Sequence, residues 1–116
     1  MRSAEAKVRQ LLSREFKGRF KETRLQIGKN IKGKPAFKKF DAVSNNKRIV
    51  AIVKDYSADN IRGNQTRHAR VVRDLYYLSL VKAERKFMYL SRDYYEWFKQ
   101  QRDAAIAPGI EVRVIP

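Results

Sequence analysis

The sequence predicts a single α/β domain, residues 1–116, in which a mixed β-sheet is flanked by helices. Its 116 residues are close to the commonest size for one domain. Segments with helical periodicity and segments rich in β-branched residues follow in the order α-β-β-β-α-β-α-β. Hydrophobic residues make up 43% of the chain, enough for a core without disulfides, and the chain has no cysteine. We therefore expect one core and no second module.

An amphipathic helix is expected at the N-terminus. Ser3 can cap it, and apolar residues then recur at spacings of three and four as far as Phe16. Gly18 is expected to end the helix, because glycine readily takes the left-handed conformation common at helix ends. A short strand at 24–28 and a turn-rich loop at 30–36 should follow, since a glycine and a proline interrupt regular structure in that loop.

Two β-rich runs, 37–44 and 48–54, are predicted to form an antiparallel hairpin. A short polar connection, Asn-Asn-Lys, separates them, and asparagine accepts turn conformations. The second run is almost wholly apolar, which is typical of a central strand buried on both faces. The remaining elements are a helix at 64–83, a strand at 86–90, a helix at 91–103 and a strand at 110–115.

The chain is strongly basic. It has 27 lysines and arginines against 12 acidic residues, a formal net charge of +15 and a pI of about 10.4. Such a surplus repels itself unless a polyanion is close, so nucleic acid is the favoured partner. The alternative is a charged surface that serves solubility alone. The basic residues are densest between 14 and 39, a stretch with only two glutamates.

The N-terminal residues carry basic side chains with no apolar run behind them, so no secretory signal is expected. No stretch approaches the roughly 18 apolar residues that a membrane span requires. We therefore expect a cytoplasmic protein with no membrane partner.

A candidate catalytic site lies in the central hairpin. Because side chains alternate along a strand, residues 52 and 54 project from one face, and the partner strand can bring Asp41 beside them. Mg²⁺ and Mn²⁺ prefer oxygen ligands, which Asp41 and the carbonyl of Val53 could provide. Lys54 could then orient an attacking water or steady the charge on a phosphate. The alternative is a basic α/β domain in which Asp41 and Lys54 simply pair as ions.

The segment FDAVSNNKRIVAIVKDYSADN, with a helix and a strand before it and a long helix and a strand after it, resembles the PD-(D/E)XK restriction-endonuclease-like superfamily. The resemblance implies an α-β-β-β-α-β core and a metal-dependent nuclease acting on DNA. It places the motif aspartate on Asp41 and the motif lysine on Lys54. The second motif acid falls on Ile52, which has no ligand atom, so we expect phosphodiester hydrolysis to be weakened or lost.

Another acid could replace the one missing at residue 52. The resemblance points to an acid of the first helix, either Glu5 or Glu15, and we assign Glu5 to the catalytic set. The alternative is an acid on a neighbouring element, for which the candidates are Asp55, Asp59 and Glu22.

Basic residues of the second long helix are candidate phosphate contacts. Three arginines follow at steps of three and should form an exposed stripe, while three apolar residues face the sheet. The predicted nucleic-acid contacts are Arg62, Arg67, Arg70, Arg73, Lys38 and Lys39. The residues predicted to face the sheet are Ala69, Val72 and Leu75. His68, the only histidine, could contact phosphate or act as a general base, although a single histidine more often does neither.

Two aromatic segments, 75–78 and 94–98, could stack on unpaired bases. Their helical spacing favours core packing instead, with a homodimer interface as a further alternative. The favoured function is DNA binding, with duplex or branched DNA preferred to RNA. The rival is a non-enzymatic RNA-binding or ribosome-associated protein, which the charge supports equally, and a third hypothesis is a subunit of a larger complex.

Overall fold

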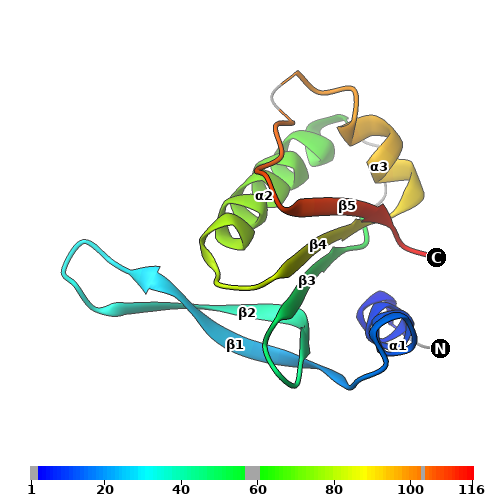
Figure 1. The fold of residues 1–116 in the computed structure, drawn as a ribbon. Coiled ribbons are helices and arrows are strands. Elements are labelled where there is room, and N and C mark those ends of the chain that lie inside the picture. Colours follow the sequence, from blue (N-terminus) through cyan, green and yellow to red (C-terminus); the bar gives the residue numbers. More distant parts are fainter. Residues whose placement is uncertain (1–2, 57–60, 103) are drawn as a thin grey trace.

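The computed structural model describes residues 3–56, 61–102 and 104–116, and the side chains of the long second helix from residue 65 onward. These residues form one α/β domain with a five-stranded mixed sheet and three helices, as predicted (Figure 1). Along the chain the elements are α1 (Ala4–Phe16), β1 (Phe20–Lys29), β2 (Pro35–Ser44), β3 (Ile49–Lys54), α2 (Ile61–Leu80), β4 (Arg85–Leu90), α3 (Arg92–Phe98) and β5 (Ile110–Val114).

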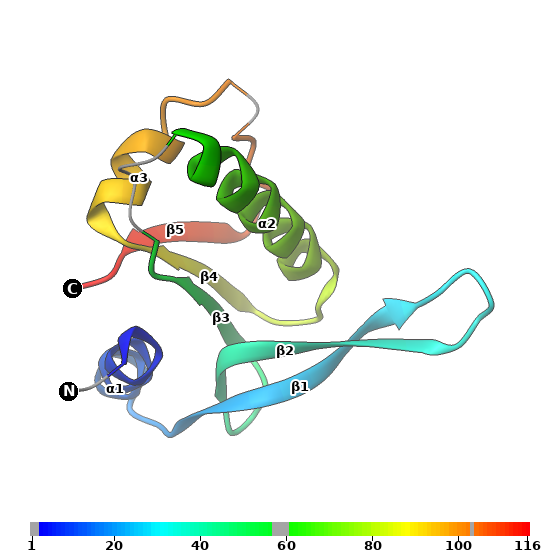
Figure 2. The same cartoon turned by 180° about the vertical axis from the view of Figure 1, so that it is seen from behind.

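The strands lie in the order β1-β2-β3-β4-β5 across the sheet. The first three strands form an antiparallel meander, whereas β3, β4 and β5 run parallel to one another. Helices α2 and α3 cover one face of the sheet, and α1 covers the other (Figures 1 and 2). Each parallel pair is joined through a helix, because the chain must return to the same end of the sheet.

Strand β3 is the centre of the core because helices bury both of its faces. Val50 and Ile52 pack on the side of α2 and α3, whereas Ala51 and Val53 pack on the side of α1. All four side chains are at most 5% exposed. The almost wholly apolar sequence of this strand is therefore explained by its position between two helical layers.

The first two strands are longer than the sequence analysis predicts. β1 begins at Phe20 instead of residue 24, and β2 begins at Pro35, inside the predicted loop. Pro35 pairs with Lys29 at the far end of the hairpin. A proline is tolerated there because the first residue of a strand can do without its N–H.

The helices differ from the prediction at their ends. α1 ends at Phe16, and Lys17 rather than Gly18 takes the left-handed conformation, with a φ of 53°. α2 begins and ends three residues earlier than predicted, and α3 ends five residues earlier. Helix ends depend on capping contacts, which the periodicity of apolar residues does not report.

Strands β1 and β2 continue beyond the sheet as a two-stranded ribbon. β2 pairs with β3 only at Ala42 and Val43, so residues 23–40 have no third strand beside them in the described part of the chain (Figures 1 and 2). The β2 residues beyond the sheet, 35–40, span about 20 Å at the usual rise of a strand. We call residues 23–40 the arm.

Candidate functional site

Asp41 lies at the point where the arm leaves the sheet. One extra residue in β2 leaves Asp41 and Ala42 together opposite Glu22, which forms a β-bulge. Asp41 Oδ2 accepts a hydrogen bond of 2.8 Å from the backbone N–H of Val53 in β3. The Asp41 side chain therefore joins β2 to β3 just where their backbone pairing ends.

The Asp41 carboxyl group has acidic and basic neighbours on different elements. Burial raises its pKa above the ordinary value, and the hydrogen bond from Val53 acts in the opposite direction. Glu5 of α1 raises the pKa further, while the positive charges of Lys54 and Lys38 lower it. The structure thus places Asp41 within electrostatic reach of Glu5 and Lys54, the two residues predicted to act with it.

The direct partner of Lys54 is Asp74 of α2, an acid that the sequence analysis does not assign to the site. Lys54 Nζ lies 2.6 Å from Asp74 Oδ2, and Lys38 Nζ lies 3.7 Å from Oδ1. The Asp74 side chain is fully buried, whereas Lys54 and Lys38 keep 18% and 25% of their exposure. A buried carboxylate needs such partners because it has lost its hydration. Among the described residues, the ion pair of Lys54 is therefore with α2 and not with Asp41.

Two acids and two lysines gather at the base of the arm. We call Lys38, Asp41, Lys54 and Asp74 the charge cluster. It joins the arm, the end of β3 and the middle of α2, which are distant in the sequence. Arg73 adds a further cation, with its Nε 3.8 Å from Asp74 Oδ1. Asp74 is fully buried beneath these three cations. This part of the cluster therefore exposes positive charge to solvent.

One pattern in the sequence could have identified Asp74. It is the only acidic residue of α2, in a helix that carries several arginines. It lies three residues after Val71 and four before Leu78, and both of these are fully buried. Residues at these spacings share one face of a helix, so an acid among them is a buried acid.

The orientation of α2 differs from the prediction. Leu75 is buried as expected, but Ala69 and Val72 are exposed. His68 is buried instead, and its ring lies against α3, with ring centroids 5.6 Å from Trp97 and 5.5 Å from Phe98. This aromatic environment is typical of a packed histidine.

The other candidate acids have different positions. Glu15 accepts hydrogen bonds of 2.6 and 2.9 Å from Arg113 of β5, so it links α1 to that strand. Glu22 pairs with an exposed lysine at the base of the arm, and Asp55 is exposed. Asp59 lies outside the described residues. Of the predicted replacements that the structure describes, Glu5 is the acid that acts electrostatically on Asp41.

The described side chains do not fit a magnesium or manganese site. Ile52 is 1% exposed and packs on the side of α2, so it provides no ligand. One oxygen of Asp41 already accepts from Val53, and Asp74 is paired with Lys54. No group of three or more His, Cys, Asp or Glu side chains suited to a metal occurs in the described residues. Asp41 and the Val53 carbonyl, the predicted ligands, therefore lack the further acids that would complete a site within this part of the chain.

The predicted nucleic-acid contacts have different exposures. The exposed ones are Arg70, Arg73 and Lys39. Arg67 is partly buried, with its guanidinium carbon 5.4 Å from the Tyr56 ring centroid. Lys38 belongs to the charge cluster. The side chain of Arg62 lies outside the described residues.

The aromatic segments mainly fill the core. In segment 94–98, Tyr94 and Phe98 are buried between α2, α3 and the sheet, and Tyr95 and Trp97 are partly buried against the same core, as core packing requires. In segment 75–78 the two leucines are buried, whereas Tyr77 is only partly buried. Tyr76 differs, because 59% of its surface is exposed. Stacking on bases is therefore left to the aromatic side chains that keep exposed surface, which are Tyr76 and Tyr77 on α2 and Tyr95 and Trp97 on α3.

Searches with protein-family models, against curated proteins and against solved structures give no match to this chain. Within the described part, no helix is both long and apolar enough to cross a membrane. The functional proposals therefore depend on the residues of this chain and on their geometry.

Proposed function

We propose that the protein binds DNA through a restriction-endonuclease-like fold, with contacts made mainly to phosphate. The observation that carries this proposal is the exposed positive charge on the two elements that border the charge cluster. Arg70 and Arg73 lie on α2, and Lys39 lies on the arm. The chain as a whole has a formal net charge of +15. Arginine and lysine bind backbone phosphates through charge-assisted hydrogen bonds, which position a nucleic acid without reading its sequence.

The order of the elements supports the choice of DNA over RNA. α1, β1, β2, β3, α2 and β4 follow one another as the resemblance to the PD-(D/E)XK superfamily implies. Asp41 and Lys54 lie on adjacent strands, close enough to interact electrostatically. The preference for DNA therefore depends on the resemblance, which implies a DNA-cleaving motif at Asp41 and Lys54.

We expect phosphodiester hydrolysis to be weak or absent. Ile52 stands at the position of the second motif acid and is buried in the core. One observation nevertheless favours hydrolysis as a second candidate function. α2 brings the carboxylate of Asp74 to Lys54, so a second acid is present beside the motif lysine.

Binding is tested by fluorescence anisotropy with labelled DNA and RNA duplexes of equal length. DNA affinity should fall steeply as salt rises, with a log–log slope of about −0.9 for each neutralised phosphate. A slope near zero would exclude binding through phosphate. Tighter binding of RNA than of DNA at the same salt would favour the rival, an RNA-binding protein.

Hydrolysis is tested with plasmid and branched DNA in the presence of Mg²⁺ or Mn²⁺. Little cleavage by the native protein is expected. Strong cleavage that is abolished in both Asp41→Ala and Asp74→Asn, but kept in Glu96→Gln, would establish the second candidate. Glu96 is a suitable control because it is an exposed acid on α3, where it pairs with Lys99. Circular dichroism of each variant shows whether the fold is retained.

A further inference from the structure

We propose that the arm enters the minor groove of duplex DNA and that Ile31, at its tip, inserts as a wedge between base pairs. This inference rests on the DNA binding proposed above and assigns a contact to it. The observations that carry it are the charge of the arm, the fixed geometry of its turn and the exposure of its tip residue.

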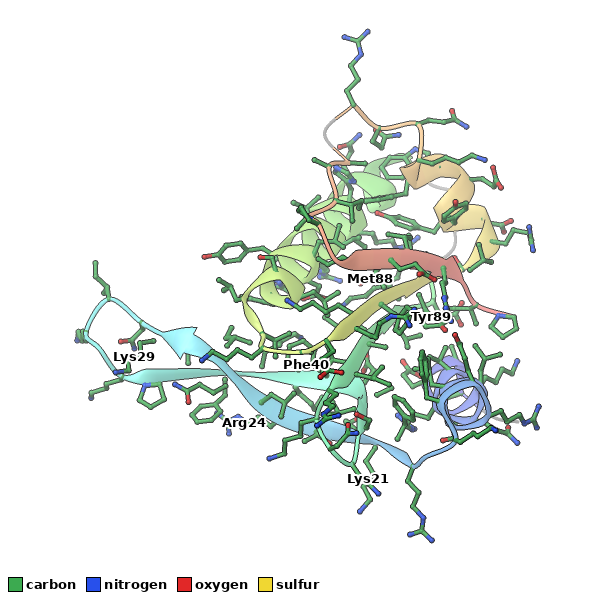
Figure 3. The ribbon with its side chains drawn as sticks, viewed as in Figure 1. Lys21, Arg24, Lys29, Phe40, Met88 and Tyr89 are labelled. Atoms are coloured by element: carbon green, nitrogen blue, oxygen red, sulfur yellow. The ribbon has the colours of Figure 1, made fainter. Side chains whose placement is uncertain are left out.

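The arm is purely cationic. Residues 23–40 include six lysines and arginines and no aspartate or glutamate. Lys29, Lys32 and Lys34 are exposed near the tip, and the ion pairs formed between described residues include none of them. Figure 3 shows Lys29 close to the tip and Arg24 farther along the ribbon. These charges are therefore available to phosphates on both sides of a groove.

The turn at the tip is held in one conformation by hydrogen bonds. Asn30 Oδ1 accepts from the backbone N–H groups of Lys32 at 2.9 Å and Lys34 at 3.0 Å. The Asn30 N–H donates to the carbonyl of Lys34 at 2.8 Å. Gly33 has a φ of +79°, which a residue with a side chain rarely adopts. The tip is therefore preorganised, so little conformational entropy is lost when it binds.

Ile31 is the fully exposed apolar residue at the end of this turn. Its relative exposure is 102%, compared with 59% for Tyr76 and 49% for Phe37. Turns normally present glycine, proline or small polar residues to solvent, and a β-branched apolar side chain there gains nothing from the fold. Proteins that bend DNA insert such apolar side chains, isoleucine among them, between base steps.

The dimensions of the arm suit a groove. A two-stranded ribbon is a recognised element for entering DNA grooves, and this one extends about 20 Å beyond the sheet. Leu25, Ile27 and Lys38 contact the rest of the domain on the α2 side, so the outer part, residues 28–36, is the part that enters the groove. On the side turned away from α2, the guanidinium carbon of Arg24 lies 4.9 Å from the centroid of the half-exposed Phe37 ring. This pair presents a flat surface and a positive charge to a sugar-phosphate strand.

A second copy of the chain is a poorer occupant for the arm. Pairing two arms edge to edge would place lysines opposite lysines, and like charges in that position are destabilising. The formal net charge of +15 on each chain adds a general repulsion. Duplex DNA instead offers phosphates for the lysines and stacked bases for the apolar tip.

The test uses the whole chain and a DNA duplex that contains 2-aminopurine, whose fluorescence rises when a base is unstacked. The native protein should raise this fluorescence. Ile31→Ser should abolish the rise and weaken binding about tenfold, while Ile31→Leu should retain both. Both variants should fold, because the side chain is fully exposed. Tyr76→Ser, which removes an exposed apolar side chain from α2, should leave the fluorescence rise unchanged.

The salt dependence of DNA binding tests the lysines of the tip independently of Ile31. Replacing Lys29, Lys32 and Lys34 by alanine should reduce the salt slope by about 0.9 for each phosphate that is no longer neutralised. If the native protein binds DNA but Ile31→Ser behaves as the native protein does, the wedge is refuted and the proposed function is not. If the native protein binds no duplex at low salt, both proposals fail. Dimerisation that disappears in the arm variants, with DNA binding unchanged, would assign the arm to a second copy.

Discussion

Replacing Lys54 by methionine should strongly destabilise the fold, because it removes the closest counter-charge of a buried acid. The Asp74 side chain has no exposed surface, and Lys54 lies 2.6 Å from it. Breaking a buried pair by removing one partner typically costs 3–5 kcal/mol. Lys38 at 3.7 Å and Arg73 at 3.8 Å would still offset part of the negative charge. We therefore expect a loss near the lower end of that range, about 3 kcal/mol in the free energy of unfolding.

The assay is equilibrium unfolding in urea at neutral pH. At about 2 kcal/mol per molar urea, a loss of this size lowers the midpoint by about 1.5 M. The matched control is Lys99→Met, which breaks a pair of the same 2.6 Å distance with Glu96, in which both side chains are about half exposed. That variant should leave the midpoint almost unchanged, because exposed pairs are screened by water and salt.

The double variant Lys54→Met with Asp74→Leu separates loss of packing from an unpaired charge. Replacing both members of a buried pair by apolar residues of similar size is often neutral or stabilising, so the double variant should recover most of the lost stability. The reasoning is refuted if Lys54→Met costs less than about 1 kcal/mol. It is also refuted if the double variant is no more stable than the single variant, since the loss would then not come from the charge of Asp74.

Three further predictions concern the same region. Burial raises the pKa of Asp41 above its unfolded value, so the folded state binds more protons between the two values and stability falls as pH rises through that interval. Asp41→Asn, which keeps an oxygen for the Val53 N–H, should therefore raise the free energy of unfolding at pH 7 and leave it unchanged below the unfolded pKa, as measured by urea unfolding at both pH values. Arg70→Ala with Arg73→Ala should weaken binding equally on unrelated DNA sequences and reduce the salt slope by about 0.9 per phosphate, and unequal losses would indicate base recognition instead. Ile52→Glu should destabilise the fold, since it buries a carboxylate where isoleucine is 1% exposed. Recovery of its melting temperature on addition of Mn²⁺, absent with chelator, would show that residue 52 can reach a cation beside Asp41.

The sequence predicted the architecture well where a periodic pattern reported burial directly. The apolar run of β3 predicted a strand covered on both faces, and helices lie on both faces. Ser3 was predicted to cap α1, and its side chain accepts from the N–H of Ala6. Both features follow from local chemistry, in which neighbouring residues along the chain decide the outcome.

The orientation of α2 was predicted less well because the pattern contains a buried acid. Periodicity arguments assign polar residues to solvent, so they give no buried position to Asp74, and the predicted sheet-facing set of Ala69, Val72 and Leu75 is rotated from the observed face. In the structure Asp74 is buried, because Lys54 and Lys38 pair with its carboxylate from two strands that lie far away in the sequence. A contact between distant segments of this kind has no signal in a local pattern.

The length of the arm also could not be predicted from local sequence patterns. The feature found where the arm leaves the sheet connects the two functional proposals. The sequence pattern identified both arm strands as β-structure. It did not identify the point at which β2 stops pairing with β3. That point coincides with the bulge at Asp41 and Ala42, where one extra residue of β2 breaks the regular register with β1. A bulge bends its strand and increases the local twist, so the same residue that turns the Asp41 carboxylate toward β3 also directs β2 away from the sheet. The position of the candidate acid and the projection of the basic arm therefore have a single structural origin, and a substitution that removes the bulge should disturb both.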